Sequence, residues 1–270
     1  MIFRAALLQI DSQDDKDTNL GKISRMIDEA AEKHADFIAM PELVNYIGGR
    51  RGFIENSEDI PDGETSELFS RKAREHHTWI LGGSIAERIP DDDTHVYNTS
   101  AVFNPKGEVA AMYRKLHLAD HATLTESSII SAGSSITTFT TPFAKMGVAI
   151  CYDLRFPELF RAMALRDAKV IVVPSEFNIN TGRDHWETLL RARAIENACW
   201  IVAPDQIGTK RNMTSTGRSM VVDPFGNVIA KASDRECVLM AEIDTDYVDT
   251  VRARMPSLNH RRPDVYGHVC

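Results

Sequence analysis

Residues 146–158 read MGVAICYDLRFPE, an apolar run that gives way to polar residues and then to a proline. The apolar part, 146–150, is typical of a short buried strand. Pro157 suits the first turn of a helix, because no amide donor is needed there. Cys151 therefore lies between a strand and a helix N-terminus, whose partial positive charge favours a thiolate. The stretch makes Cys151 a candidate nucleophile, with a buried, inert cysteine as the alternative.

Two other stretches carry the residue types that a cysteine nucleophile needs. FIAMPE at 37–42 is an apolar strand that ends in Glu42, and MYRKLHL at 112–118 places Lys115 among apolar and basic neighbours. Hydrolysis of an amide by a thiol requires a base, a cation for the oxyanion and an acid for the departing amine. Glu42 and Lys115 are candidates for these roles. Taken singly, a glutamate in this position is more often a cap or a surface charge, and a lysine in this position is more often solvated.

Glu42, Lys115 and Cys151 are separated by 73 and 36 residues, and in order and spacing they resemble the three signatures of the nitrilase superfamily, the carbon–nitrogen hydrolases. The resemblance continues through TGRDHW at 181–186, RARAIEN at 191–197 and HRRPDVY at 260–266. It implies an α/β fold, a four-layer αββα sandwich with two mixed sheets. It also implies that Glu42 is the general base, that Lys115 stabilises the tetrahedral intermediate, and that Cys151 forms the acyl-enzyme.

Further positions gain roles from the same resemblance. Glu126 lies where many family members carry an additional active-site glutamate, and an exposed loop acid is the alternative. The amide of Tyr152 is a candidate second donor to the oxyanion beside Lys115, as at other strand-to-helix elbows. His117 follows Lys115 by two residues and is interpreted as structural.

The stretch around Cys151 is similar to the branch that contains omega-amidases and deaminated-glutathione amidases, which release ammonia from terminal amides of small carboxylic or 2-oxo acids. In that branch the positions of Arg155, Phe177 and Thr181 line the substrate site, and an arginine suits a carboxylate through two parallel hydrogen bonds. Glu176 departs from the pattern, because that branch usually has a small residue there. An acid in the pocket would repel a substrate carboxylate or attract an amine, unless it pairs with Arg155 or Arg183.

The expected function is therefore that of an amidase that acts on a small-molecule amide through a thioester. An N-carbamoyl-amine or aliphatic amide hydrolase of the same superfamily is the alternative, and the complete triad disfavours a non-catalytic binding scaffold. The sequence contains no HExxH, GxGxxG or Walker motif, so it predicts no metal and no cofactor.

Composition restricts the remaining possibilities. A length of 270 residues with 43% hydrophobic content suits a single domain over 1–270. The net charge of −8 argues against nucleic acid or an anionic membrane surface as a partner, and no run approaches the roughly 20 apolar residues of a membrane span. Cysteines 151, 199, 237 and 270 lack zinc or CxxC spacing, which predicts reduced thiols and a cytoplasmic protein. The resemblance suggests a homodimer or higher homo-oligomer, with the tail at 252–270 as a candidate interface.

Hydrophobic periodicity and turn residues predict the other elements. Strands are expected at 2–9, 37–40, 78–85, 146–150, 168–174, 199–203 and 238–243, and hairpins at 98–115 and 218–231. Helices are expected after a cap at Asp17 or Thr18, at 63–77, at 157–167, after a capping box at Asp184 and Glu187, and at 246–254. Segments 46–56 and 117–131 are predicted to be loops over a pocket.

Overall fold

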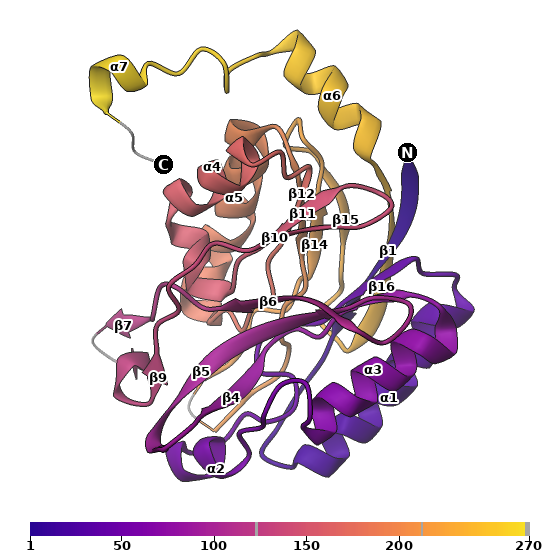
Figure 1. Cartoon of the computed structure of the whole chain (residues 1–270), viewed down its shortest axis with the longest axis vertical. Helices are drawn as coiled ribbons and strands as arrows, with labels where there is room; N and C mark the ends of the chain where they lie inside the picture. The colour runs from indigo at the N-terminus through magenta and orange to yellow at the C-terminus, as the bar shows by residue number, and fades with distance from the viewer. Residues whose placement is uncertain (122–123, 212, 268–270) are drawn as a thin grey trace.

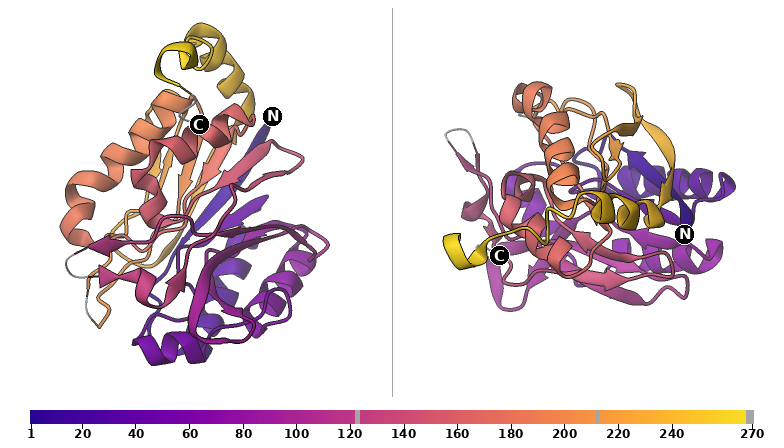
Figure 2. Two further views of the ribbon diagram at one scale, coloured as in Figure 1. Left: turned by 60° about the vertical axis from the view of Figure 1, so that its left-hand side comes forward. Right: turned by 90° about the horizontal axis from the view of Figure 1, so that it is seen from above.

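Two β-sheets lie face to face between two layers of helices in this computed structural model (Figure 1 and Figure 2). The structure describes residues 1–121, 124–211 and 213–267. The strands of the first sheet are β1 (Ile2–Gln9), β2 (Phe37–Ala39), β3 (Trp79–Leu81), β4 (Ile85–Ile89), β5 (Asp92–Phe103), β6 (Val109–Arg114), β9 (Ile130–Ser131) and β16 (Cys237–Asp244). Those of the second are β10 (Thr138–Thr140), β11 (Lys145–Val148), β12 (Val170–Val172), β13 (Trp200–Ala203), β14 (Met220–Val222) and β15 (Val228–Lys231).

The helices cover the outer faces and extend beyond the sandwich at one end (Figure 1). They are α1 (Lys16–Glu32), α2 (Arg50–Glu55), α3 (Glu64–His76), α4 (Pro157–Leu165), α5 (Ile179–Asn197), α6 (Thr245–Arg254) and α7 (Pro263–Tyr266), with 3-10 turns η1 (Glu126–Ser128) and η2 (Cys151–Arg155). Strands β7 (Asp120–His121) and β8 (Leu124–Thr125) form a separate pair.

Both sheets are mixed. The first has the order β16-β1-β2-β3-β5-β4, with β6 and β9 also pairing with β5, and the second runs from β10 to β15 in sequence order. The pairs β1–β2 and β2–β3 are parallel, as are β11–β12 and β12–β13, while β1–β16 and β13–β14 are antiparallel. The predicted four-layer αββα sandwich is confirmed.

The alternation of side chains on β1 explains why this strand is apolar throughout. Phe3, Ala5 and Leu7 belong to the core between the two sheets, whereas Ala6 and Leu8 pack with residues of α1 and α3. Successive side chains of a strand point to opposite faces, so a strand covered on both sides needs no polar face.

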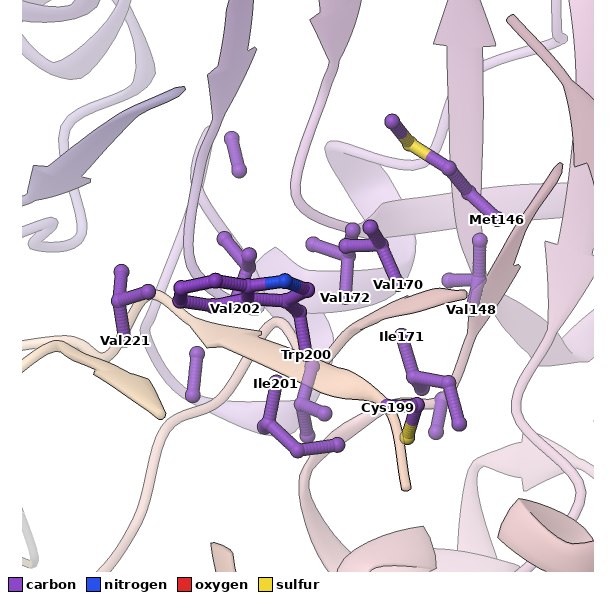
Figure 3. Packing of buried hydrophobic residues seen from close by; sticks show 14 of the residues in the cluster. Met146, Val148, Val170, Ile171, Val172, Cys199, Trp200, Ile201, Val202 and Val221 are labelled. Atoms are coloured by element: carbon purple, nitrogen blue, oxygen red, sulfur yellow. The ribbon is translucent and has the colours of Figure 1, made fainter. Parts of the chain in front are cut away.

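The second sheet follows the same rule (Figure 3). Val170, Val172 and Trp200 point to one side of it, and Ile171 and Ile201 point to the other. Together these residues form part of one core cluster that reaches from the first sheet to α4 and α5. The site described below therefore rests on a scaffold that is packed on both faces.

Two predicted helix starts are wrong. The N-cap of α1 is Asp15, whose side chain accepts a hydrogen bond from the Thr18 amide at 3.1 Å, so Asp17 and Thr18 lie inside the first turn. Helix α5 begins at Ile179 after the cap Asn178, which places Asp184 inside the helix and removes the predicted capping box. Position 182 in this first turn is a glycine, because a Cβ there would lie 1.8 Å from Thr216 Oγ1.

Two predicted loops contain regular structure, and one predicted strand is broken. Segment 46–56 includes helix α2, and segment 117–131 includes η1 and short strands. The strand expected at 78–85 is divided into β3 and the start of β4, because Gly83 has φ +62° and a Cβ there would lie 2.0 Å from the Pro41 carbonyl oxygen. A close approach of this kind requires glycine.

The C-terminal segment runs along one end of the sandwich (Figure 1). Met255, Val265 and Tyr266 are exposed on it. That the tail at 252–270 lies at an oligomer interface stays a prediction, and residues 268–270, with Cys270, lie outside the described part. No helix in the described ranges is both long enough and apolar enough to cross a membrane.

Candidate active site

The candidate residues meet where strands of both sheets end. Glu42 follows β2, Cys151 follows β11 and Glu176 follows β12, three strands that each pair in parallel with a neighbour. Carboxyl ends of parallel strands lie at one edge of a sheet, a frequent position for ligand sites. A hydrogen bond from the Glu42 amide to the Ser175 carbonyl oxygen at 3.3 Å joins the edges of the two sheets.

Cys151 is at the first position of η2, and its side chain is partly exposed. Its φ is +45°, in the left-handed region that a non-glycine residue adopts only at a cost. The Cys151 amide donates to the Pro174 carbonyl oxygen at 2.9 Å, and its Sγ lies 3.6 Å from the Glu176 carbonyl oxygen. The backbone therefore holds the thiol at a sharp turn between strand and helix, as at a nucleophile elbow.

Asp153 fixes this turn, and the sequence analysis missed it. Its fully buried carboxylate accepts from the Tyr113 hydroxyl at 2.7 Å, the Ile150 amide at 2.8 Å, and both the amide and Nδ1 of His117 at 3.0 and 2.7 Å. His117 also stacks on Phe156 with ring centroids 3.6 Å apart, in line with the structural role expected for it. An acid two residues after a candidate nucleophile was the available signal.

Glu42 is 2% exposed, and both of its carboxylate oxygens are occupied. Oε1 accepts from Lys115 Nζ at 2.9 Å and from Asn98 Nδ2 at 2.8 Å, and Oε2 accepts from the Glu176 amide at 3.0 Å. Together with burial, the charge of the carboxylate raises the pKa of the Cys151 thiol. Asn98 is a second residue that sequence analysis missed, because it lies in the middle of β5 and carries no local motif.

Lys115 lies between two carboxylates. Its ammonium group is 2.9 Å from Glu42 Oε1 and 2.9 Å from Glu126 Oε1, and its side chain is fully buried. Glu126, at the start of η1, is anchored through Oε2 by the Ala119 amide at 2.7 Å. The structure thus brings Glu42, Lys115, Glu126 and Cys151 together around one ammonium group.

The structure corrects the expected state of the thiol. Burial raises the pKa of Cys151 well above its usual range, and the negative charge of Glu42 adds to this while Lys115 opposes it. Burial works to lower the pKa of Lys115, but Glu126 and Glu42 outweigh it and hold that pKa well above the usual value. These directions favour an ammonium ion beside a neutral thiol, with the Glu42 carboxylate as a nearby acceptor for the thiol proton.

The residues expected to bind substrate lie in the segments that follow Cys151 and Glu176 and at the start of α5. The Arg155 guanidinium carbon lies 5.2 Å from the ring centroid of Phe177 and 5.6 Å from that of Tyr152, and Nη1 is 3.2 Å from His185 Nδ1. Phe177 is buried, whereas Thr181 Oγ1 bonds back to the Asn178 carbonyl oxygen at 3.3 Å.

Glu176 does not pair with Arg155 or Arg183. Its side chain instead accepts a hydrogen bond from Ser215 Oγ at 3.1 Å through Oε1. Within the described ranges, no carboxylate lies within 4 Å of the Arg155 guanidinium. Both alternatives that assigned Arg155 or Arg183 to Glu176 are therefore wrong, and the Arg155 charge stands without an acidic partner beside Phe177.

One group of metal-ligating residue types lies elsewhere in the described part of the chain. Asp28, Glu75 and His76 come together on the outer surface of α1 and α3. The Lys72 ammonium already contacts Asp28 Oδ1 at 2.6 Å. A cation on the carboxylate disfavours a metal ion there.

Cys151 should be the cysteine that iodoacetamide modifies first, because Glu42 is in position to accept its proton. Cys199 is fully buried, which raises its pKa to about 12, and Cys237 has a raised pKa through burial without such a base. Peptide mass spectrometry over a time course measures the rates at Cys151, Cys199, Cys237 and Cys270. The Glu42→Gln variant is the control, and it should slow the Cys151 adduct alone. Faster labelling of Cys237 than of Cys151 in the wild-type protein would contradict the assignment.

Comparison with known proteins identifies the family. The carbon-nitrogen hydrolase family matches residues 4–253. Omega-amidase NIT2-A of Xenopus laevis is 40% identical over 271 residues, covering 98% of this chain and 97% of the relative. The nitrilase and fragile histidine triad fusion protein NitFhit of Caenorhabditis elegans is 40% identical over 268 residues, 97% of this chain, which spans only 61% of the fusion protein.

Solved structures agree with these relatives. The crystal structure of the C. elegans NitFhit protein has a TM-score of 0.94 at 39% identity, with 99% of this chain and 66% of that chain covered. Nit3 of Saccharomyces cerevisiae, a member of branch 10 of the nitrilase superfamily, has a TM-score of 0.89 at 32% identity, with 97% of each chain covered. The chain therefore belongs to the carbon-nitrogen hydrolase family, as its motifs predicted.

Proposed function

We propose that this protein is an amidase that hydrolyses the terminal amide of a small carboxylic or 2-oxo acid and releases ammonia through a thioester on Cys151. The omega-amidase named among its relatives supports the reaction class. The observation that carries the substrate class is the Arg155 guanidinium, which lies 5.2 Å from Phe177 and has no carboxylate within 4 Å in the described part of the chain. A planar cation of this kind suits a substrate carboxylate.

The first half-reaction transfers the acyl group to sulfur. Glu42 accepts the proton of the Cys151 thiol, and the sulfur attacks the amide carbon. The oxygen that becomes negative is stabilised by the Lys115 ammonium and by the Tyr152 amide, which is near a helix start where amides lack partners within the helix. Protonated Glu42 then gives its proton to the nitrogen, the C–N bond breaks, and ammonia leaves.

The second half-reaction restores the enzyme. Glu42 accepts a proton from a water molecule, the hydroxide oxygen attacks the thioester carbon, and the same donors stabilise the oxyanion. The C–S bond breaks, Cys151 recovers its proton, and the free acid leaves. Glu126 keeps Lys115 charged and oriented through the 2.9 Å contact, so it acts through the ammonium group.

Ammonia release from a panel of amides tests this function. Succinamate and succinamide form a matched pair, because they have almost the same shape and differ in one negative charge. We expect a higher kcat/KM for succinamate, with no release by Cys151→Ala. Carbon dioxide together with ammonia from an N-carbamoyl compound would favour the carbamoyl alternative. Absence of ammonia from every amide and ureido compound would overturn the enzymatic proposal.

Arg155→Ala should raise KM for succinamate by about ten- to a hundredfold and change KM for succinamide little. The loss of a charged hydrogen-bonding partner costs roughly 1.5–3 kcal/mol. Only succinamate has a carboxylate that would lose its hydrogen bonds to Arg155. Steady-state ammonia release by both substrates measures the effect. Arg183→Ala is the control, since Arg183 is an exposed arginine of α5. An equal effect of Arg155→Ala on both substrates would contradict the assignment.

A further inference from the structure

The backbone of Glu176 contacts both Glu42 and Cys151. Its amide donates to Glu42 Oε2 at 3.0 Å, and its carbonyl oxygen is the neighbour of Cys151 Sγ at 3.6 Å. The residue therefore bridges the base and the nucleophile. Any change in the charge of its side chain occurs next to the atoms that perform the proposed reaction.

The carboxyl group of Glu176 is partly buried and has one side-chain partner. Ser215 Oγ donates to Oε1 at 3.1 Å. Within residues 1–121, 124–211 and 213–267, no cation lies within 4 Å of this carboxyl group. Lys210 is the basic side chain on the neighbouring loop, but its ammonium group contacts the Asp11 carboxylate and donates to the Ile207 carbonyl oxygen at 2.8 Å. A carboxyl group that is partly withdrawn from water and has no counter-charge favours its neutral form.

Several nearby charged and polar groups affect the pKa of the Glu176 carboxyl group. Burial raises the pKa of Glu176 to about 8, and Glu42 adds to this, while Lys210, the Ser215 hydroxyl and Lys115 oppose it. Asp205, two residues after β13, is a fully buried acid, and the charge of Glu176 contributes to the raised pKa of Asp205. Two other acids, Glu42 and Asp205, therefore lie near Glu176. The two nearby basic groups, Lys210 and Lys115, contact other carboxylates.

We propose that Glu176 is a specificity-determining residue that admits anionic amides while its carboxyl group is neutral and excludes them once it is ionised. The identity of the substrate in this proposal rests on the proposed function. The change in charge of Glu176 is independent of that function. It explains how a pocket expected to bind a substrate carboxylate contains an additional acid. The neutral acid does not repel the substrate, and Arg155 supplies the attraction.

Two substrates that differ in charge isolate the effect of Glu176. The ratio of kcat/KM for succinamate to that for succinamide cancels every titration that affects both substrates equally. From pH 6.5 to 9 this ratio should fall about tenfold, the size expected for two unit charges on the order of 10 Å apart at an effective dielectric constant of about 20. The range ends at pH 9 because burial lowers the pKa of Lys210.

Glu176→Gln is the matched variant. Its amide oxygen can still accept from Ser215 Oγ, and it cannot ionise, so its ratio should stay constant over the same range. Ser215→Ala removes a hydrogen bond that favours the ionised form, so its midpoint should move to higher pH. A constant ratio in the wild-type protein, or the same fall in Glu176→Gln, would overturn the proposal.

Alkylation of Cys151 provides a readout that needs no amide hydrolysis. Iodoacetate is anionic and iodoacetamide is neutral, and the ratio of their rates at Cys151 reports the local charge. This ratio should also fall about tenfold from pH 6.5 to 9 in the wild-type protein and stay constant in Glu176→Gln. If no amide is hydrolysed but the alkylation ratio behaves in this way, the proposed function fails and the charge switch stands. An alkylation ratio that does not respond to pH would overturn the switch, whatever the substrate.

Discussion

Ammonia release by the Glu42→Gln variant should fall by roughly a hundred- to ten-thousandfold, the usual contribution of a general acid–base group. Glutamine has the shape of glutamate, and its one acceptor oxygen can still accept from Lys115 and Asn98, whereas its NH2 group replaces the oxygen that accepts from the Glu176 amide. It cannot take the proton of a thiol whose pKa burial has raised. Steady-state ammonia release and circular dichroism, measured side by side, separate loss of chemistry from loss of fold.

Glu58→Gln is the control for this variant. Glu58 is also a buried carboxylate, with Lys16 Nζ at 2.9 Å and the Thr65 amide at 2.8 Å, but it belongs to a separate set of contacts. Turnover by Glu58→Gln should equal that of the wild-type protein. If folded Glu42→Gln retained turnover within a few-fold of wild type, Glu42 would not be the base.

Lys115→Met should lower the free energy of unfolding by about 3–5 kcal/mol and remove turnover. The cost arises because Glu42 and Glu126 would stay buried without their shared cation, and breaking a buried ion pair from one side costs this much. Urea denaturation followed by circular dichroism measures it. Lys169→Met is the control: its ammonium group contacts Asp249 at the surface, and such pairs contribute about 0–1 kcal/mol.

The deficit of Lys115→Met should grow as pH rises from 5 to 8. Burial already raises the pKa of Glu42 in the presence of Lys115, and removing the cation raises it further. A carboxyl group that holds its proton in the folded state but loses it in the unfolded state destabilises the fold as pH rises above its unfolded pKa. A deficit that is constant over this range, or largest at pH 5, would contradict the ion-pair assignment.

Local sequence was sufficient where a single element carries the information. The apolar runs before Glu42 and Cys151 are strands, because a sheet covered on both faces needs no polar side chains. Pro157 begins α4 as predicted. The position of the motifs at strand ends then brings Glu42, Lys115 and Cys151 together, although they are far apart in the sequence.

Local sequence was insufficient where a distant residue decides the conformation. Asp184 and Glu187 indicated a helix start, but α5 begins at Ile179, and Thr216 leaves room only for a glycine at position 182 in its first turn. The partner of Glu176 is Ser215, 39 residues away on another loop. The same holds for the protonation of Cys151: the helix N-terminus suggested a thiolate, whereas burial and two nearby carboxylates favour the thiol.

The pairing of the first and last strands sets an order for synthesis on the ribosome. All eight residues of β1 pair with β16, from Ile2 with Asp244 to Gln9 with Cys237. Until residue 244 has left the exit tunnel, β1 has an open edge, even though all four residues of the array around Lys115 have long been made. An unpaired apolar edge is a template for aggregation. The nascent chain thus contains all four candidate active-site residues through a long interval in which its open edge needs protection from other chains.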